Sequence, residues 1–77
     1  MTAVSSALIS QAWQLGQGAG WCAGGRGRRL PREAPRRLLD MLDCDPAQVT
    51  AEQEAALRAE YMRGVADGLE DATRDDE

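Results

Sequence analysis

The sequence predicts a small all-α protein: a helical hairpin of two long antiparallel helices with a short third helix in the connector. Apolar residues recur at spacings of three and four along two long segments, which is the period of an amphipathic helix. Glycines, arginines and prolines interrupt that period between the two segments. With 77 residues the chain has room for one small helical domain over 1–77, with a thin core.

The first long helix is expected from about Ser5 to Ala23. Ser5 or Ser6 would cap its start, since a serine hydroxyl accepts hydrogen bonds from the first free backbone N–H groups. Its apolar stripe consists of Leu8, Ala12, Leu15, Ala19 and Cys22.

A loop rich in glycine, arginine and proline is expected over 24–34, followed by a short helix from about Pro35 to Leu42. Proline suits the first turn of a helix. The stretch 43–46 should end the short helix, because Asp45 precedes Pro46 and the residue before a proline avoids α geometry. The residues expected to be buried are Leu38, Leu39 and Leu42.

The second long helix is expected to begin at Thr50, where Thr50 and Gln53 fit a capping box. It should end near Ala72, leaving 73–77 as a frayed acidic tail. Its apolar stripe is Leu57, Tyr61, Val65 and Leu69.

Residues 13–21 and 61–69 repeat one pattern: an aromatic residue, two residues, glycine, three residues, glycine and a large apolar residue. Each interior glycine costs a helix about 1 kcal/mol, and close approach of another helix would offset that cost. We therefore expect the glycine faces of the two long helices to pack together; alternatively, they face a second copy of the chain in a homodimer. The helix-packing residues are Gly16, Gly20, Gly64, Gly68, Trp13 and Tyr61.

Charge is segregated along the chain: 1–25 is uncharged, 26–37 is basic, and 40–77 is acidic. Two candidate partner-binding surfaces follow, although the basic loop could instead pair with the acidic helix of the same chain. The acidic face consists of Glu52, Glu60, Asp67, Glu70 and Asp71. The basic loop carries Arg26, Arg28, Arg29, Arg32, Arg36 and Arg37.

The composition argues against an enzyme. Histidine and lysine are absent, so no nucleophile–base pair is visible, and no catalytic residue, metal site or cofactor is expected. Cys22 and Cys44 are expected to be free thiols that behave as small buried hydrophobic residues, with a disulfide between them as the alternative. The uncharged stretch 3–25 carries six Ser and Gln side chains, which disfavours a membrane span. The start of the chain does not resemble a signal peptide, so a cytoplasmic location is expected.

Small residues recur along the first long helix at Ala12, Gly16, Ala19, Gly20 and Gly24. A connector with arginines and prolines follows, and the second long helix then carries an aromatic residue three positions before a glycine. This pattern resembles the ribosome modulation factor family and similar small phage-encoded proteins. The resemblance covers about residues 11–30 and 57–71. It implies ribosome binding in which Arg26, Arg28 and Arg29 contact RNA. The longer connector and the acidic composition depart from that family.

Two functional hypotheses follow. The first is a small regulatory binding protein, such as a phage-type inhibitor, that presents its acidic helical face to a host protein or nucleoprotein complex. The second is a ribosome- or RNA-associated factor that binds through the arginine-rich loop. A scaffolding subunit assembled through the glycine faces is a third alternative.

Overall fold

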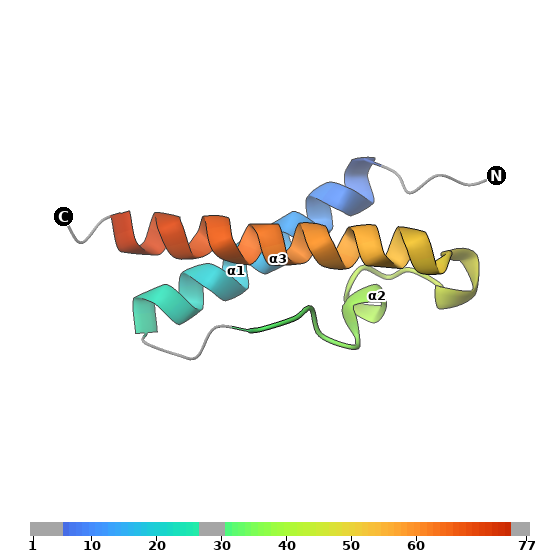
Figure 1. Cartoon of the computed structure of the whole chain (residues 1–77), viewed down its shortest axis with the longest axis horizontal. Helices are drawn as coiled ribbons and strands as arrows, with labels where there is room; N and C mark the ends of the chain where they lie inside the picture. Colours follow the sequence, from blue (N-terminus) through green and yellow to red (C-terminus); the bar gives the residue numbers. More distant parts are fainter. Residues whose placement is uncertain (1–5, 27–30, 75–77) are drawn as a thin grey trace.

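The computed structural model describes residues 6–26 and 31–74, except for the side chains of residues 25 and 26. Its elements are α1 (Ser6–Arg26), α2 (Leu38–Met41), the 3-10 turn η1 (Pro46–Gln48) and α3 (Ala51–Arg74). No strand occurs in the described part of the chain. Figure 1 shows α1 and α3 packed together with the connector beneath them. The predicted all-α class, with two long helices and a short one between them, is confirmed.

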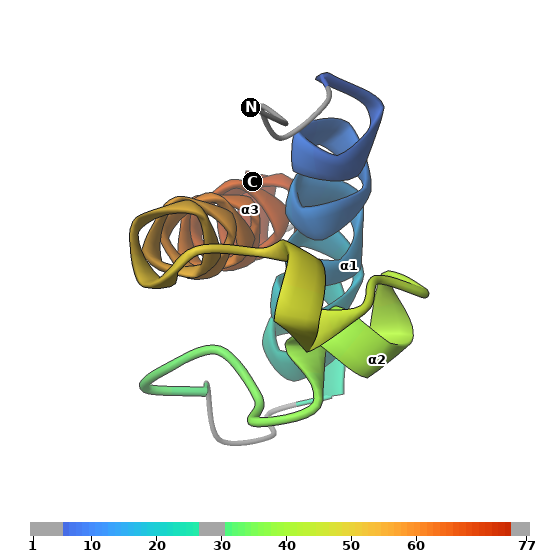
Figure 2. The same ribbon diagram turned by 90° about the vertical axis from the view of Figure 1, so that its right-hand side faces the viewer.

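The two long helices are parallel, so the predicted antiparallel direction is wrong. Gly16 lies against Tyr61, and Gly20 lies against Val65, so the contacts advance in the same direction along both helices. Both helices run from right to left in Figure 1, and the view of Figure 2 shows them crossing. A parallel pair is possible because 27–50 is long enough to return beside the helices to the start of α3.

Three predicted boundaries are also wrong. α1 continues through Gly24 to Arg26, and α3 continues past Ala72 to Arg74, whereas α2 is shorter than expected. Gly24 does not end α1 because it still serves the helix contact: a Cβ there would lie 2.9 Å from the Cβ of Ala72. The predicted helix start at Ser5 and tail residues 75–77 lie outside the described residues.

An aliphatic core fills the space between the helix pair and the connector. Leu38 of α2 and Leu57 of α3 are both fully buried, and Tyr61 and Val65 continue the core along α3. The predicted burial of the connector leucines is confirmed. The buried members of this cluster are Ala12, Ala34, Leu38, Leu39, Leu42, Leu57, Tyr61 and Val65.

Side-chain caps and a left-handed residue set the ends of the connector elements. The Thr50 N–H donates to Gln53 Oε1 at 3.0 Å and the Gln53 N–H donates to Thr50 Oγ1 at 3.1 Å, which confirms the capping box. Asp43, with φ of 55°, ends α2 in a Schellman arrangement, in which the Cys44 N–H donates to the Leu39 carbonyl. Asp45 then caps η1 by accepting from the Ala47 N–H.

Candidate functional site

The seam between α1 and α3 is a contact between backbones. A Cβ on Gly16 would overlap the carbonyl oxygen of Tyr61, and a Cβ on Gly20 would overlap that of Val65. The α3 glycines Gly64 and Gly68 meet α1 backbone in the same way. Each glycine of the repeated pattern therefore admits a neighbouring helix, which offsets its cost to helix stability.

The seam contacts are related by an approximate two-fold operation within one chain. In the internal repeat, Gly16 corresponds to Gly64, and Trp13 corresponds to Tyr61. Gly16 lies against Tyr61, and the corresponding residues, Gly64 and Trp13, lie against each other. Gly20 with Val65 is matched in the same way by Gly68 with Gln17. This reciprocity is the hallmark of an isologous interface between two identical subunits. The two copies of the internal repeat therefore pack against each other as the two subunits of a parallel homodimer would.

Two acids of the predicted acidic face hold this seam together. The Trp13 indole N–H donates to Asp67 Oδ2 at 2.7 Å, and the Gln17 amide donates to Asp71 Oδ2 at 3.3 Å. All four side chains are partly buried. Asp67 and Asp71, which are predicted from the sequence to lie on a partner-binding surface, make contacts between α1 and α3.

The other acids of that face have arginine neighbours, with one exception. Glu60 lies 3.6 Å from Arg63, and Glu70 lies 3.5 Å from Arg74. Arg63, Glu70 and Arg74 are exposed and Glu60 is half-buried, so each pair contributes little to stability, but each lowers the net charge that the face presents. Glu52 is exposed and makes no ion pair with any described residue.

Tyr61 is the buried aromatic residue of the seam, with 6% of its surface exposed. Burial raises the pKa of its phenol above the ordinary value, because desolvation disfavours the phenolate. Its counterpart in the repeat, Trp13, is half-buried and uses its polar edge to reach Asp67.

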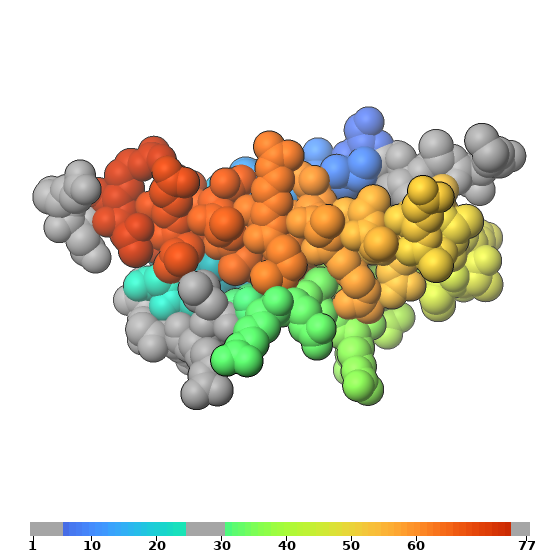
Figure 3. Space-filling view, viewed as in Figure 1, coloured from blue at the N-terminus to red at the C-terminus, as the bar shows by residue number. Residues whose placement is uncertain are grey.

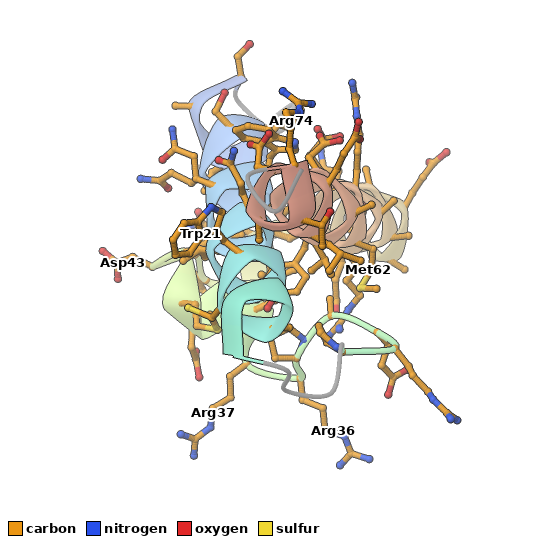
Figure 4. The ribbon with its side chains drawn as sticks, turned by 90° about the vertical axis from the view of Figure 1, so that its left-hand side faces the viewer. Trp21, Arg36, Arg37, Asp43, Met62 and Arg74 are labelled. Carbon is orange, nitrogen blue, oxygen red and sulfur yellow. The ribbon has the colours of Figure 1, made fainter. Side chains whose placement is uncertain are left out.

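The second surface is a turn that carries two adjacent arginines. The Leu38 N–H donates to the Pro35 carbonyl at 3.1 Å, which makes Arg36 and Arg37 the central residues of a β-turn. Both arginines are exposed, and so is Arg32. Figure 4 shows Arg36 and Arg37 pointing away from both long helices, on the opposite side of the molecule from Arg74. We call Arg32, Arg36 and Arg37 the arginine turn.

The arginine turn forms no ion pair with any acid in the described residues. The alternative in which the basic loop pairs with the acidic helix of its own chain is therefore wrong for these three arginines. The reason is geometric: the connector lies beneath the helix pair, and in Figure 3 its side chains project away from α3. Arg26, Arg28 and Arg29 were predicted to act with this segment, but their side chains lie outside the described residues.

Arg58, which is not among the residues predicted from the sequence, positions the arginine turn. Its Nη1 donates to the carbonyl oxygens of Ala34 and Pro35, both at 3.1 Å, and its Nε donates to Glu54 at 3.0 Å. Buried Leu38 follows the two turn arginines directly. The turn is therefore fixed on both sides. The sequence carries no signal for this role, because Arg58 and Pro35 are far apart along the chain.

The cysteines differ from expectation. Both are free thiols, but Cys22 is exposed rather than buried, whereas Cys44 is half-buried against the core. No helix within the described residues is long and apolar enough to cross a membrane.

No family model matches this chain, and no curated protein or solved structure shows significant similarity to it.

Proposed function

We propose that this chain is a non-enzymatic RNA-binding protein that grips RNA phosphates with its arginine turn. The observation that carries the proposal is the contrast in charge pairing. Arg32, Arg36 and Arg37 are exposed and form no ion pair with any described acid, whereas most acids of α3 have an ion-pair or hydrogen-bond partner. Arginine suits this role because its planar fork donates two parallel hydrogen bonds to a phosphate.

The rigidity of the turn supports the proposal. Arg58 fixes the backbone just before Arg36 by binding two carbonyl oxygens, and Leu38 buries the backbone just after Arg37. A fixed turn loses little entropy when it binds, so more of the phosphate attraction is retained as affinity. The net charge of −4 opposes RNA binding. The largest group of described acids lies on α3, but Glu33, Asp40 and Asp43 share the connector with the turn.

The test measures binding of a fluorescent structured RNA to the full chain by anisotropy over a range of salt concentrations. We expect affinity to fall as salt rises, because binding releases counterions from the RNA. The double variant Arg36→Ala/Arg37→Ala should weaken binding on the order of tenfold or more, since two charge-assisted contacts are lost. A DNA duplex arm shows whether RNA is preferred over phosphate in general.

The matched control is Arg63→Ala/Arg74→Ala, which removes the same charge from two exposed arginines of α3. It should leave RNA affinity nearly unchanged. Equal loss in both double variants would mean that overall charge alone drives binding, and the proposal would then fail. Absence of RNA binding at low salt would also overturn it.

The predicted acidic face supports a second candidate: a regulatory binding protein that docks on a basic host protein. The observation in its favour is a groove of about 230 Å³ beside the seam, where Ile9 is exposed next to two carboxylates. A partner arginine could place its stem on Ile9 and its guanidinium between Glu60 and Asp67. The groove is lined by Ile9, Ser10, Trp13, Glu60, Arg63 and Asp67.

A capture experiment separates the two candidates. The full chain is used as bait in a bacterial lysate, with and without nuclease. A protein retained after nuclease treatment, and lost on Glu60→Gln, favours the acidic groove. Material that disappears with nuclease, and with Arg36→Ala/Arg37→Ala, favours the arginine turn.

A further inference from the structure

The internal repeat is symmetric in its glycines but not in the polar side chains beside them. Gly16 and Gly20 correspond to Gly64 and Gly68, and all four lie against the backbone of the other helix. These contacts alone would serve equally well if two α1 helices, or two α3 helices, from separate chains came together. The glycines therefore do not explain why α1 pairs with α3.

The hydrogen-bond donors at the seam lie on α1, and their acceptors lie on α3. The Trp13 indole donates to Asp67 at 2.7 Å, and the Gln17 amide donates to Asp71 at 3.3 Å. The two donors are four residues apart, and so are the two acceptors, so each pair lies along one side of its helix. The polar contacts thus form a row beside the glycines, with a direction from α1 to α3.

The positions of α1 that correspond to the two acids carry alanine. Ala19 corresponds to Asp67 in the internal repeat, and the same correspondence continued by one turn matches Ala23 with Asp71. Ala23 is buried and Ala19 is half-buried. A methyl group neither donates nor accepts a hydrogen bond, so the two-fold relation of the seam is broken where the polar groups meet.

We propose that Asp67 and Asp71 select the partner of the glycine seam, so that α1 pairs with α3 and not with the α1 of a second chain. Specificity of this kind requires a contact that the correct pair makes and the wrong pair lacks. The two carboxylates supply that contact, because each accepts a hydrogen bond from α1. The proposal does not depend on RNA binding.

A pair of α1 helices would lose both polar contacts. With the geometry of the present seam, Trp13 of each chain would face Ala19 of the other, and Gln17 would face Ala23. The indole N–H and the amide would then lie beside methyl groups, without acceptors. Both donor side chains are half-buried, so losing their acceptors is destabilising.

A pair of α3 helices would place carboxylates in the seam without enough donors. The acids of both chains would come to one seam, where like charges repel. Each Asp71 would face Val65, which is 4% exposed and has no side-chain donor. A carboxylate beside buried aliphatic groups is unfavourable unless it is hydrogen-bonded. Of the three pairings, only α1 with α3 gives both donors and both carboxylates a partner.

Nuclear Overhauser contacts in the full chain, measured up to millimolar concentration, test the proposal. At about that concentration, pairing between chains competes with pairing through a flexible connector. A contact between the aromatic ring at position 13 and the Ala19 methyl group reports a pair of α1 helices. These positions are six residues apart, so they do not meet within one helix. The wild type should lack this contact at every concentration; its presence there overturns the proposal.

Removal of the two acceptors should allow the wrong pairing. In Asp67→Ala/Asp71→Ala, we expect the contact between position 13 and Ala19 to appear and to strengthen with protein concentration. The population of paired α1 helices should rise about tenfold or more, because two hydrogen bonds to carboxylates no longer distinguish the pairings. Asp67→Asn/Asp71→Asn keeps an acceptor oxygen at each position and should behave as the wild type.

A variant on the other helix keeps the test decisive if Asp67→Ala/Asp71→Ala does not fold. Trp13→Phe/Gln17→Leu removes both donors and keeps apolar side chains in their place, so a pair of α1 helices no longer leaves polar groups unpaired. It should show the same contact, between the ring at position 13 and the Ala19 methyl group. Folded variants that still pair only α1 with α3 overturn the proposal, since the acids would then stabilise the seam without selecting it.

The matched control is Glu52→Ala/Glu70→Ala, which removes the same charge from two exposed acids of α3. Glu70 accepts from Arg74 of its own helix, and Glu52 makes no ion pair with any described residue. The control should lack the contact between α1 helices at every concentration. If the control shows that contact as strongly as Asp67→Ala/Asp71→Ala, net charge alone keeps the chains apart, and the proposal fails.

Discussion

On the inner face of α1, Gly16 and Gly20 lie directly against the backbone of α3, whereas on the outer face Gly18 borders open space. The three glycines look alike in sequence, and each costs an isolated helix about the same. The inner two are held in place by a neighbour that leaves no room for a side chain. A glycine in a helix therefore marks close approach of another helix only where a partner backbone is present.

The largest effect is expected from filling the inner face. Gly20→Leu would drive a side chain into the Val65 carbonyl, so α1 and α3 must separate. Overpacking costs about 1–3 kcal/mol where the structure can adjust, and two rigid backbones adjust little. We expect a cost of at least about 3 kcal/mol, enough to unfold so small a domain. Thermal melts followed by circular dichroism measure the loss; a cooperative melt near the wild-type temperature would disprove the seam.

A smaller effect is expected from removing a polar contact across the seam. Trp13→Phe keeps the aromatic ring but removes the N–H that donates to Asp67. A hydrogen bond to a carboxylate contributes about 1.5–3 kcal/mol, and partial exposure reduces this to about 1 kcal/mol. Urea unfolding of Trp13→Phe, Asp67→Asn and the double variant gives the coupling between the two residues. A coupling of zero would show that the contact does not stabilise the pair.

A substitution at Gly18, on the outer side of α1, should raise the free energy of unfolding rather than lower it. Gly18→Ala adds a methyl group where nothing lies within 4 Å, so the helix gains stability of about 0.5–1 kcal/mol. The comparison variant Gly16→Ala should lose stability, because its methyl group overlaps the Tyr61 carbonyl. Urea unfolding at concentrations where the chain is monomeric measures both. The same sign for both variants would remove the distinction between the two faces.

The smallest effect at neutral pH is expected at Tyr61, where titration alone changes stability. Its pKa is higher in the folded chain than in the unfolded chain, because burial disfavours the phenolate. The contribution of Tyr61 to stability is therefore constant below its unfolded pKa of about 10 and is lost as pH rises through its folded pKa. Urea unfolding between neutral and strongly alkaline pH measures this fall. Tyr61→Phe should flatten it; an unchanged slope would assign the loss to other groups.

The charged side chains, like the glycines, differ in whether they have a partner within the chain. Counting charges along the sequence gives an acidic α3 and a basic segment over 26–37. Asp67 and Asp71, however, accept hydrogen bonds from α1, whereas Arg36 and Arg37 are exposed to solvent. Side chains of one kind differ in availability because the fold decides which of them have partners.

Local chemistry determined much of this protein in advance. Apolar spacing located both long helices, the Thr50–Gln53 capping box located the start of α3, and the glycine pattern identified the faces that meet. These features depend on residues within a few positions of one another, so they can be read from the sequence. The buried connector leucines belong to the same group.

The tertiary structure alone decided the direction of the helix pair and the roles of its polar residues. Small residues four apart form the same ridge whether the neighbouring helix is parallel or antiparallel, so the glycine pattern cannot distinguish the two. The parallel direction brings Trp13 to Asp67 and Arg58 to Pro35, residues that are distant along the chain. Such pairings depend on the path of the connector in space, and no local pattern encodes that path.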